Sequence, residues 1–246
     1  MIIGSKLFFV KTLPSTNTHT VHLLKTGELS EGTIIYTNYQ SAGRGQTGNR
    51  WESEEGKNLL ISVLLYPYMI NAADQFLISM TISLGICDFL KKYTTNCSIK
   101  WPNDIYIGND KIAGILIENC LLGDQIENSI AGIGLNINQE KFLSDAPNPV
   151  SLKLITGKCH DLPTCLNNLS SCLDRRYKQL ISENYTQIKQ EYITKLFRLN
   201  EWHAFRDLNG NFTGRIRSVT DFGRLQIEKR EGKLIEYSFK EVDFIL

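Results

Sequence analysis

The segment Asn109-Asp-Lys-Ile-Ala-Gly-Ile-Leu-Ile-Glu118 predicts both a central strand of the fold and a candidate site residue. Its apolar and β-branched residues from Lys111 to Glu118 predict a largely buried strand. Lysine is seldom buried unless it has a partner, so Lys111 at the mouth of the strand is a candidate site residue. A solvated hairpin edge would carry a lysine equally well. Gly114 leaves room for another group to lie against the backbone.

The regions on both sides of this strand predict a mixture of strands and helices. Runs of β-branched and aromatic residues predict strands, and apolar residues at helical spacing predict helices. The expected strands are residues 7–10, Gly32–Tyr39, Asn58–Tyr66, Ser98–Lys100, Ile105–Ile107 and Ser129–Asn138. The expected helices run from Ser15 or Thr16 to about Lys25, and over Asn71–Lys92, Pro163–Tyr185 and Thr186–Leu199. Because strands and helices do not alternate strictly, we expect an α+β fold.

The last part of the chain has a different pattern. Arg215–Val219, Arg224–Glu228 and Leu234–Phe239 alternate polar and apolar residues and are separated by glycine-containing turns. Short strands linked in this way are typical of a small β-barrel. We therefore expect two domains, covering residues 1–199 and 200–246.

Composition excludes several classes of protein. The 246 residues carry 27 basic and 26 acidic side chains, a net charge of +1, which argues against a bulk nucleic-acid binder. No apolar stretch approaches the roughly 20 residues that span a bilayer, and the N-terminus lacks a secretory signal. The six cysteines form no C-x-x-C pair. These features predict a cytoplasmic protein with reduced thiols and no membrane partner.

A glycine-rich loop, Gln40-Ser-Ala-Gly-Arg-Gly-Gln-Thr-Gly-Asn-Arg-Trp51, lies between two expected strands. Glycines let backbone N–H groups approach an anion, and Arg44 and Arg50 add charge that suits a carboxylate or a phosphate. A flexible surface loop with incidental charges is the plainer interpretation of such a motif.

Two further segments carry polar or small residues at strand ends. In Lys100-Trp-Pro-Asn-Asp-Ile105, the Trp-Pro step restricts the backbone, so Asn103 and Asp104 could face a site. Asp104 could bind magnesium or orient a neighbouring group, and an ordinary Asn-Asp turn is the alternative. Gly132-Ile-Gly-Leu-Asn-Ile-Asn138 is a strand whose glycines permit close approach.

These four segments, in this order and at this spacing, resemble the signature of the biotin–protein ligases, which attach biotin to carboxylase carrier domains. The resemblance extends from Ser15-Thr16-Asn17 to the C-terminal barrel. It implies a mixed-sheet catalytic domain that binds biotin and ATP, flanked by helices and similar to class II synthetases. It also implies a small SH3-like barrel at the C-terminus.

The activity implied by the resemblance is that of an ATP-dependent, AMP-forming biotin–[acetyl-CoA-carboxylase] ligase. The carboxylate of biotin attacks the α-phosphate of ATP and gives biotinyl-5'-AMP and pyrophosphate. A lysine of a biotin carboxyl carrier domain then attacks the mixed anhydride and releases AMP. Two anions that meet at 4 Å repel by about 4 kcal/mol at an effective dielectric of 20, so cations and Mg²⁺ are expected at the site.

The resemblance also assigns roles to individual residues. Lys111, Arg44 and Asp104 are the expected catalytic residues, and Arg44 and Lys111 are expected to face the carboxylate and the α-phosphate. The expected biotin contacts are Ser15, Thr16, Asn17, Gln40, Gly43, Arg44, Gly45, Lys111 and Gly114. The expected contacts to ATP or the adenylate are Arg44, Asn49, Arg50, Trp51, Asn103, Lys111 and Asn136. A magnesium ion is expected near Asp104.

Some features depart from the family or leave alternatives. Many members carry arginine where this chain has Gln46, and the loop Gln139–Val150 offers only Phe142 as an aromatic that could stack on adenine. Two alternative functions are a lipoate- or octanoate-transferring enzyme of the related fold and a non-enzymatic binding module. About 14 residues precede the first motif, which is too few for a DNA-reading domain, so no specific DNA is expected. The oligomeric state stays open between a monomer and a homodimer.

Overall fold

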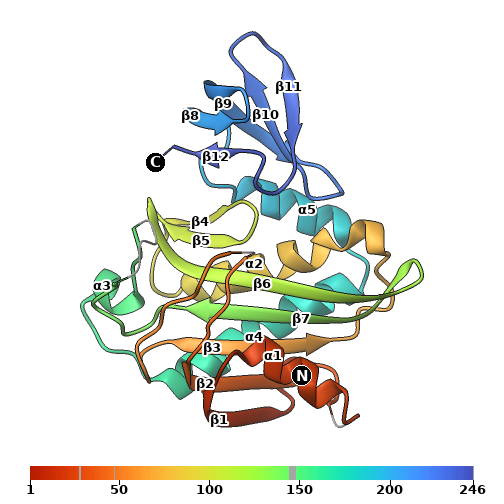
Figure 1. Cartoon of the computed structure of the whole chain (residues 1–246), viewed down its shortest axis with the longest axis vertical. Helices are drawn as coiled ribbons and strands as arrows, with labels where there is room; N and C mark the ends of the chain where they lie inside the picture. The colour runs from red at the N-terminus through yellow and green to blue at the C-terminus, as the bar shows by residue number, and fades with distance from the viewer. Residues whose placement is uncertain (28, 47, 144–147, 246) are drawn as a thin grey trace.

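The computed structural model describes residues 1–27, 29–46, 48–143 and 148–245. Its larger part is built on a seven-stranded sheet in the order β1–β2–β3–β7–β6–β5–β4 (Figure 1). The strands are β1 (Leu7–Leu13), β2 (Ile34–Gln40), β3 (Leu59–Leu65), β4 (Cys97–Lys100), β5 (Asp104–Ile107), β6 (Asp110–Leu122) and β7 (Gln125–Leu135). The β1–β2 pair is parallel and the other pairs are antiparallel, so the sheet is mixed. This confirms the expected α+β class.

Helices cover the sheet on both faces. The long helix α2 (Phe76–Leu90), preceded by a 3-10 turn at Ala72–Asp74, lies between the sheet and two further helices, α4 (Leu162–Ile181) and α5 (Tyr185–Thr194). The short helix α1 (Thr16–Leu24) packs against β2, β3 and β7. A helix with neighbours all around must be apolar all around, and every residue of α2 except Asp88 is buried.

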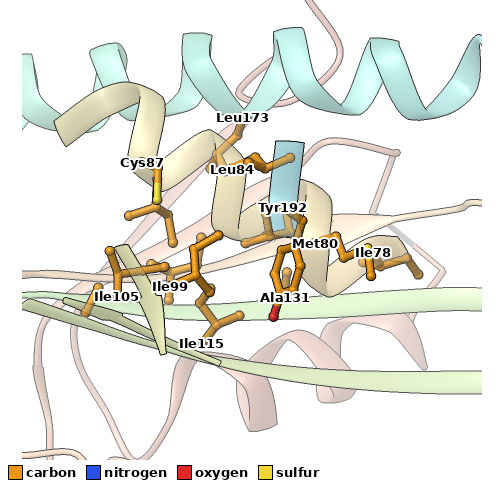
Figure 2. Close-up of a cluster of buried hydrophobic side chains, with 14 of the residues drawn as sticks. Ile78, Met80, Leu84, Cys87, Ile99, Ile105, Ile115, Ala131, Leu173 and Tyr192 are labelled. Atoms are coloured by element: carbon orange, nitrogen blue, oxygen red, sulfur yellow. The ribbon is translucent and has the colours of Figure 1, made fainter. Parts of the chain in front are cut away.

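The main core lies between α2 and the sheet. Figure 2 shows Ile78, Met80 and Leu84 of α2 within this cluster, together with Ile115 of β6 and Ala131 of β7. Gly85 allows α4 to approach closely, because a Cβ there would lie 2.7 Å from the side chain of Leu173. The sheet that carries the candidate site is therefore backed by a tightly packed layer.

The helical segment Ala72–Leu90 is long and apolar enough to cross a membrane by length and composition alone. The sequence shows no uninterrupted apolar stretch of this length, because Asp74, Gln75 and Asp88 lie within the segment. In the structure, 78% of the segment's most apolar window is buried inside the protein, as is usual for the core helix of a globular fold.

The C-terminal residues form a second, five-stranded antiparallel sheet at one end of the molecule, next to α5 and the β4–β5 hairpin (Figure 1). Its strands are β8 (Trp202–Asp207), β9 (Gly210–Val219), β10 (Leu225–Lys229), β11 (Leu234–Tyr237) and β12 (Asp243–Phe244). Among the described residues the edge strands β11 and β12 do not pair with each other, so the sheet is not a closed barrel. Its size and connections are consistent with the expected SH3-like unit.

Several element bounds differ from those expected. Strands β6 and β7 form one long hairpin around Gly123 (φ +61°), so β7 starts four residues earlier than expected and ends before Asn136. The α4 helix ends at Ile181, and Glu183 at φ +59° separates it from α5. A short helix, α3 (Leu152–Thr156), was not expected; the Ser151 hydroxyl caps it by accepting a hydrogen bond from the Leu154 N–H.

Candidate active site

A cavity of about 130 Å³ lies on the face of the sheet that the glycine-rich loop covers. The loop, the start of α1, β6, β7 and the Asn103–Asp104 turn all contribute to its wall. The lining residues are Ser15, Thr16, Asn17, Gln40, Arg44, Gly45, Gln46, Asn49, Arg50, Trp51, Ile61, Asn103, Asp104, Lys111, Gly114, Ile115, Leu116, Gly132, Ile133 and Gly134. The structure thus brings together every expected site residue except Gly43 and Asn136.

Lys111 and Asp104 form an ion pair in this wall. The Nζ atom of Lys111 lies 2.7 Å from Oδ1 of Asp104, and each side chain keeps only about a fifth of its surface exposed, 22% and 21%. The backbone of Lys111 is fixed as well, since its N–H donates to the Asn148 carbonyl (2.7 Å) and its carbonyl accepts from Val150 (2.9 Å). Lys111 is therefore a held, partly buried cation and not a solvated hairpin residue.

Asn103 is fixed against β6 by its own backbone and side chain. Its Nδ2 donates to the Ile115 carbonyl at 2.6 Å, and its carbonyl accepts from the Ile115 N–H at 2.9 Å. Asn103 immediately precedes β5, so these two bonds extend the pairing with β6 by one residue before the start of β5. They hold the Asn103–Asp104 turn in register with Gly114.

The indole of Trp51 lies over glycines of β6 and β7. A Cβ at Gly134 would lie 2.3 Å from Cε2 of Trp51, and a Cβ at Gly114 would lie 2.9 Å from Cζ3. The group for which Gly114 leaves room is therefore this indole. The buried Nε1 of Trp51 has no hydrogen-bond partner within the described part of the chain, and Nζ of Lys111 lies 5.8 Å from the ring centroid.

The start of α1 is tied to the sheet by buried polar groups. The backbone N–H and the hydroxyl of Thr16 both donate to Oε1 of Gln40, at 2.8 and 3.1 Å. The amide of Asn17 donates to the Leu116 carbonyl at 3.2 Å, and its oxygen accepts from the Ser62 hydroxyl at 2.5 Å. The expected biotin contacts from α1 thus sit on a rigid network rather than on a free helix end.

Arg44 does not share a partner with Lys111. Its Nη2 lies 2.8 Å from Oε2 of Glu118, whereas Lys111 binds Asp104. The two cations expected to face one carboxylate and one phosphate together are therefore paired with separate carboxylates. Glu118 was not among the expected site residues; the available signal was an acidic residue closing an apolar strand, with the same side-chain parity as Gly114.

Gly43 and Asn136 do not line the cavity, but each bonds to a residue that lines it or adjoins a lining residue. The Gly43 carbonyl accepts a hydrogen bond from the Trp51 N–H at 3.1 Å, and a Cβ on Gly43 would lie 2.5 Å from the Trp51 oxygen. Asn136 is 3% exposed and links Ile112, Val150 and Leu152 through its backbone and its Nδ2. Its buried Oδ1 has no partner among the described residues, and its expected contact to the nucleotide stays a prediction.

A second lysine stands beside the cavity. Lys100 lies opposite Asp104 in the β4–β5 pair, and its Nζ donates to the Tyr106 hydroxyl at 3.1 Å. Its ammonium also lies 5.1 and 5.2 Å from the ring centroids of Tyr106 and Phe244. Burial lowers the pKa of Lys100 and raises that of the Tyr106 hydroxyl.

The described residues do not form a dedicated metal site. No three His, Cys, Asp or Glu side chains gather among them in a way that would hold a metal ion, and the Asp104 carboxylate is occupied by Lys111. Mg²⁺ needs near-octahedral oxygen ligands and is commonly held through one or two carboxylates and substrate phosphates. The described residues therefore do not form a complete Mg²⁺ site by themselves, and the ion expected near Asp104 stays a prediction.

The arrangement is a mixed sheet that carries a polar cavity beside a glycine-rich loop, and comparison with known proteins identifies its family. The model of the biotin/lipoate A/B protein ligase family matches residues 9–136, which is more than half of the chain. The chain belongs to this family.

Individual relatives agree with this assignment. The chain is 30% identical over 239 residues to the bifunctional ligase/repressor BirA of Bacillus subtilis, covering 94% of this chain and 72% of that protein. It is 27% identical to the biotin–[acetyl-CoA-carboxylase] ligase of Paracoccus denitrificans, covering 84% of this chain and 88% of that one. It also resembles the structure of the biotin protein ligase from Aquifex aeolicus in complex with biotin and ATP. The TM-score is 0.81 at 26% identity, covering 98% of this chain and 99% of that one.

Proposed function

We propose that this protein is a biotin–protein ligase. It activates biotin with ATP to biotinyl-5'-AMP and then transfers biotin to a lysine of a biotin carboxyl carrier domain, such as that of acetyl-CoA carboxylase. The observation that carries the proposal is that one cavity is lined by all four motif segments, with the Lys111–Asp104 ion pair in its wall. The relatives named as biotin ligases, and the structure solved with biotin and ATP, support it.

In the first step an oxygen of the biotin carboxylate attacks the α-phosphorus, and the bond to the leaving pyrophosphate breaks. The two anions repel each other, and the ammonium of Lys111 offsets this repulsion and stabilises the charge that develops on the phosphoryl oxygens. Asp104 holds the ammonium in place. No side-chain nucleophile is required, because biotin itself supplies the attacking oxygen.

In the second step the neutral amine of the acceptor lysine attacks the carbonyl carbon of the mixed anhydride. An amide bond forms, the attacking nitrogen loses a proton to solvent, the bond between the carbonyl carbon and the phosphate oxygen breaks, and AMP leaves. The Trp51 indole and the glycine floor exclude water from one side of the cavity, which protects the anhydride from hydrolysis. Magnesium, when present, enters with the triphosphate of ATP as part of the substrate.

The alternative substrate, a lipoyl or octanoyl group, is not favoured by the site. An eight-carbon chain requires an apolar tunnel, whereas glycines and the polar side chains of Thr16, Asn17, Gln40, Asn103 and Lys111 line much of this small cavity. Their hydrogen-bonding groups suit the ureido head and the carboxylate of biotin.

The test is incubation of the purified protein with labelled biotin and ATP, followed by measurement of pyrophosphate release and of biotinyl-5'-AMP. Addition of a biotin carboxyl carrier domain should move the label onto the carrier, and a carrier whose acceptor lysine is replaced by arginine should stay unlabelled. Parallel reactions contain octanoate or lipoate instead of biotin. Pyrophosphate release with octanoate and none with biotin would replace the proposal with the alternative.

Three further expectations stay predictions. We propose that the protein works in the cytoplasm, where its six cysteines, all free in this structure, would remain reduced. With a net charge of +1 it should not bind DNA sequence-specifically, which a mobility shift with a biotin-operon fragment tests. Analytical ultracentrifugation with and without biotin and ATP decides between a monomer and a homodimer.

A further inference from the structure

We infer that Glu118 is a positioning residue for the biotin end of the cavity, which it holds in shape through Arg44 and Asn17. The inference rests on the proposed function and assigns a role to a side chain outside the cavity wall. Glu118 stands on β6, four residues after Gly114 and on the same face of the sheet.

One oxygen atom of Glu118 joins three segments of the chain. Its Oε2 accepts from Nη2 of Arg44 at 2.8 Å and from Nδ2 of Asn17 at 2.7 Å. Arg44 belongs to the glycine-rich loop, Asn17 to the first turn of α1, and Glu118 to the sheet. A hydrogen bond to a charged acceptor is stronger than one to a neutral acceptor. This atom therefore connects the glycine-rich loop, α1 and β6.

The Asn17 side of the junction is rigid. Asn17 is 2% exposed, and it also bonds to the Leu116 carbonyl and the Ser62 hydroxyl. A Cβ at Gly132 would lie 2.4 Å from Oδ1 of Asn17, so this amide is pressed against β7. Because Asn17 is fixed, the Glu118 carboxylate is fixed with it.

The Arg44 side is the one that depends on Glu118. Gly43 and Gly45 flank Arg44 and offer no side chain to anchor the loop, and the arginine side chain is itself 42% exposed. Backbone bonds from Trp51 N–H to the Gly43 carbonyl and from Gly45 N–H to the Asn49 carbonyl hold the loop to itself, and the ion pair of Arg44 ties the loop to β6. It also explains why the Arg44 guanidinium is absent from the Lys111–Asp104 pair: its charge is used to place the loop.

The experiment measures the dissociation constant for biotin, the KM for ATP and kcat of pyrophosphate release for Glu118→Gln, Arg44→Gln and the double variant. Glutamine keeps an oxygen for Asn17 and removes the charge that holds Arg44. For Glu118→Gln we expect biotin binding to weaken by about three- to tenfold, with the KM for ATP and kcat within about twofold of wild type. The double variant should bind biotin no more weakly than Arg44→Gln alone, because Glu118 acts on biotin through Arg44.

Glu127→Gln, on the neighbouring strand β7 and away from the cavity, is the matched control and should match wild type. Unchanged biotin binding in Glu118→Gln, additive effects in the double variant, or equal changes for biotin and ATP would each overturn the inference. If Glu118→Gln melts well below wild type, Glu118→Asp, which keeps the charge but shortens the side chain, takes its place and must weaken biotin binding more than it raises the KM for ATP. A wild-type protein without biotin-dependent pyrophosphate release would instead refute the proposed function.

Discussion

The indole Nε1 of Trp101 donates a hydrogen bond of 2.8 Å to the carbonyl oxygen of Gly223, and this bond crosses the junction between the two sheets. Trp101 is 4% exposed and its ring also packs against Phe239, with 5.3 Å between centroids. Two residues further along, the chain reaches Asn103 and then Asp104. The C-terminal sheet therefore holds the segment that places the partner of Lys111.

Replacing Trp101 with phenylalanine removes the donor and leaves the Gly223 carbonyl buried without its partner. We expect Trp101→Phe to lower the free energy of unfolding by about 1–3 kcal/mol, the usual cost of an unsatisfied buried group. Pyrophosphate release should fall as well, because the Asn103–Asp104 turn loses its support. Urea unfolding and turnover on one preparation measure both, and full stability with full activity would contradict the role given to the C-terminal sheet.

Lys111→Ala should reduce the rate of adenylate formation by about 10²–10³, the usual effect of removing one preorganised charged donor. The loss should appear in kcat, because charge on the phosphoryl group grows in the transition state. Lys111→Arg should restore little, since a planar guanidinium is aimed differently from an ammonium. Pyrophosphate release and thermal melting are measured together, with Lys233→Ala, in the turn before β11 of the C-terminal sheet, as the control. Near-normal turnover, or a large drop in melting temperature, would remove the catalytic role.

Gly134→Ala should push the Trp51 indole off the floor of the cavity, because the new methyl group would lie 2.3 Å from Cε2. Overpacking of this kind costs about 1–3 kcal/mol, so biotin affinity should fall by about fivefold or more. Equilibrium dialysis with labelled biotin measures this. In a Trp51→Leu background the same glycine replacement should cost little, and an equally large further loss there would show that the indole is not the obstacle.

Asp88 should contribute stability that disappears in acid. Burial acts to raise its pKa, but hydrogen bonds from Arg176 and Lys91 outweigh burial and hold the pKa below its ordinary 3.8. A carboxyl whose folded-state pKa is lowered stabilises the fold above its unfolded pKa and loses this contribution as the pH falls through the folded value.

We therefore expect Asp88→Asn to be about 2 kcal/mol less stable than wild type at pH 7. The difference should shrink below about pH 4 and approach zero once the wild-type carboxyl is protonated. Urea denaturation between pH 7 and pH 2 measures this, with Asp124→Asn in the β6–β7 turn as the control. A difference that stayed constant down to pH 2 would show that the pair with Arg176 is not its source.

The class of the fold and most of its elements could be predicted, because their signals are local. The apolar periodicity of α2 and the β-branched runs of β2, β3 and β6 lie within single segments. Strand β12 has only two residues, Asp243 and Phe244, and the break between α4 and α5 depends on one positive φ at Glu183. Neither leaves a periodic pattern that could be detected.

The candidate site was predictable as a set of segments but not as a set of pairs. The four motifs and their resemblance to one family predicted that Arg44, Asp104 and Lys111 lie at one site. Which carboxylate each cation binds is decided by contacts between residues far apart in the sequence, such as Arg44 with Glu118. The same holds for Gly134, which has no side chain and so leaves room for the indole of Trp51 from the glycine-rich loop.

The three tryptophans of this protein stand in three separate surroundings. Trp51 lies on the glycines of β6 and β7, and its indole nitrogen has no partner among the described residues. Trp101 is buried at the junction of the sheets, and the ring centroid of Trp202, in the C-terminal sheet, lies 4.8 Å from the Arg215 guanidinium. The protein therefore carries three built-in optical reporters, and variants that keep one tryptophan at a time would follow cavity filling, junction closure and unfolding of the C-terminal sheet by separate emission signals.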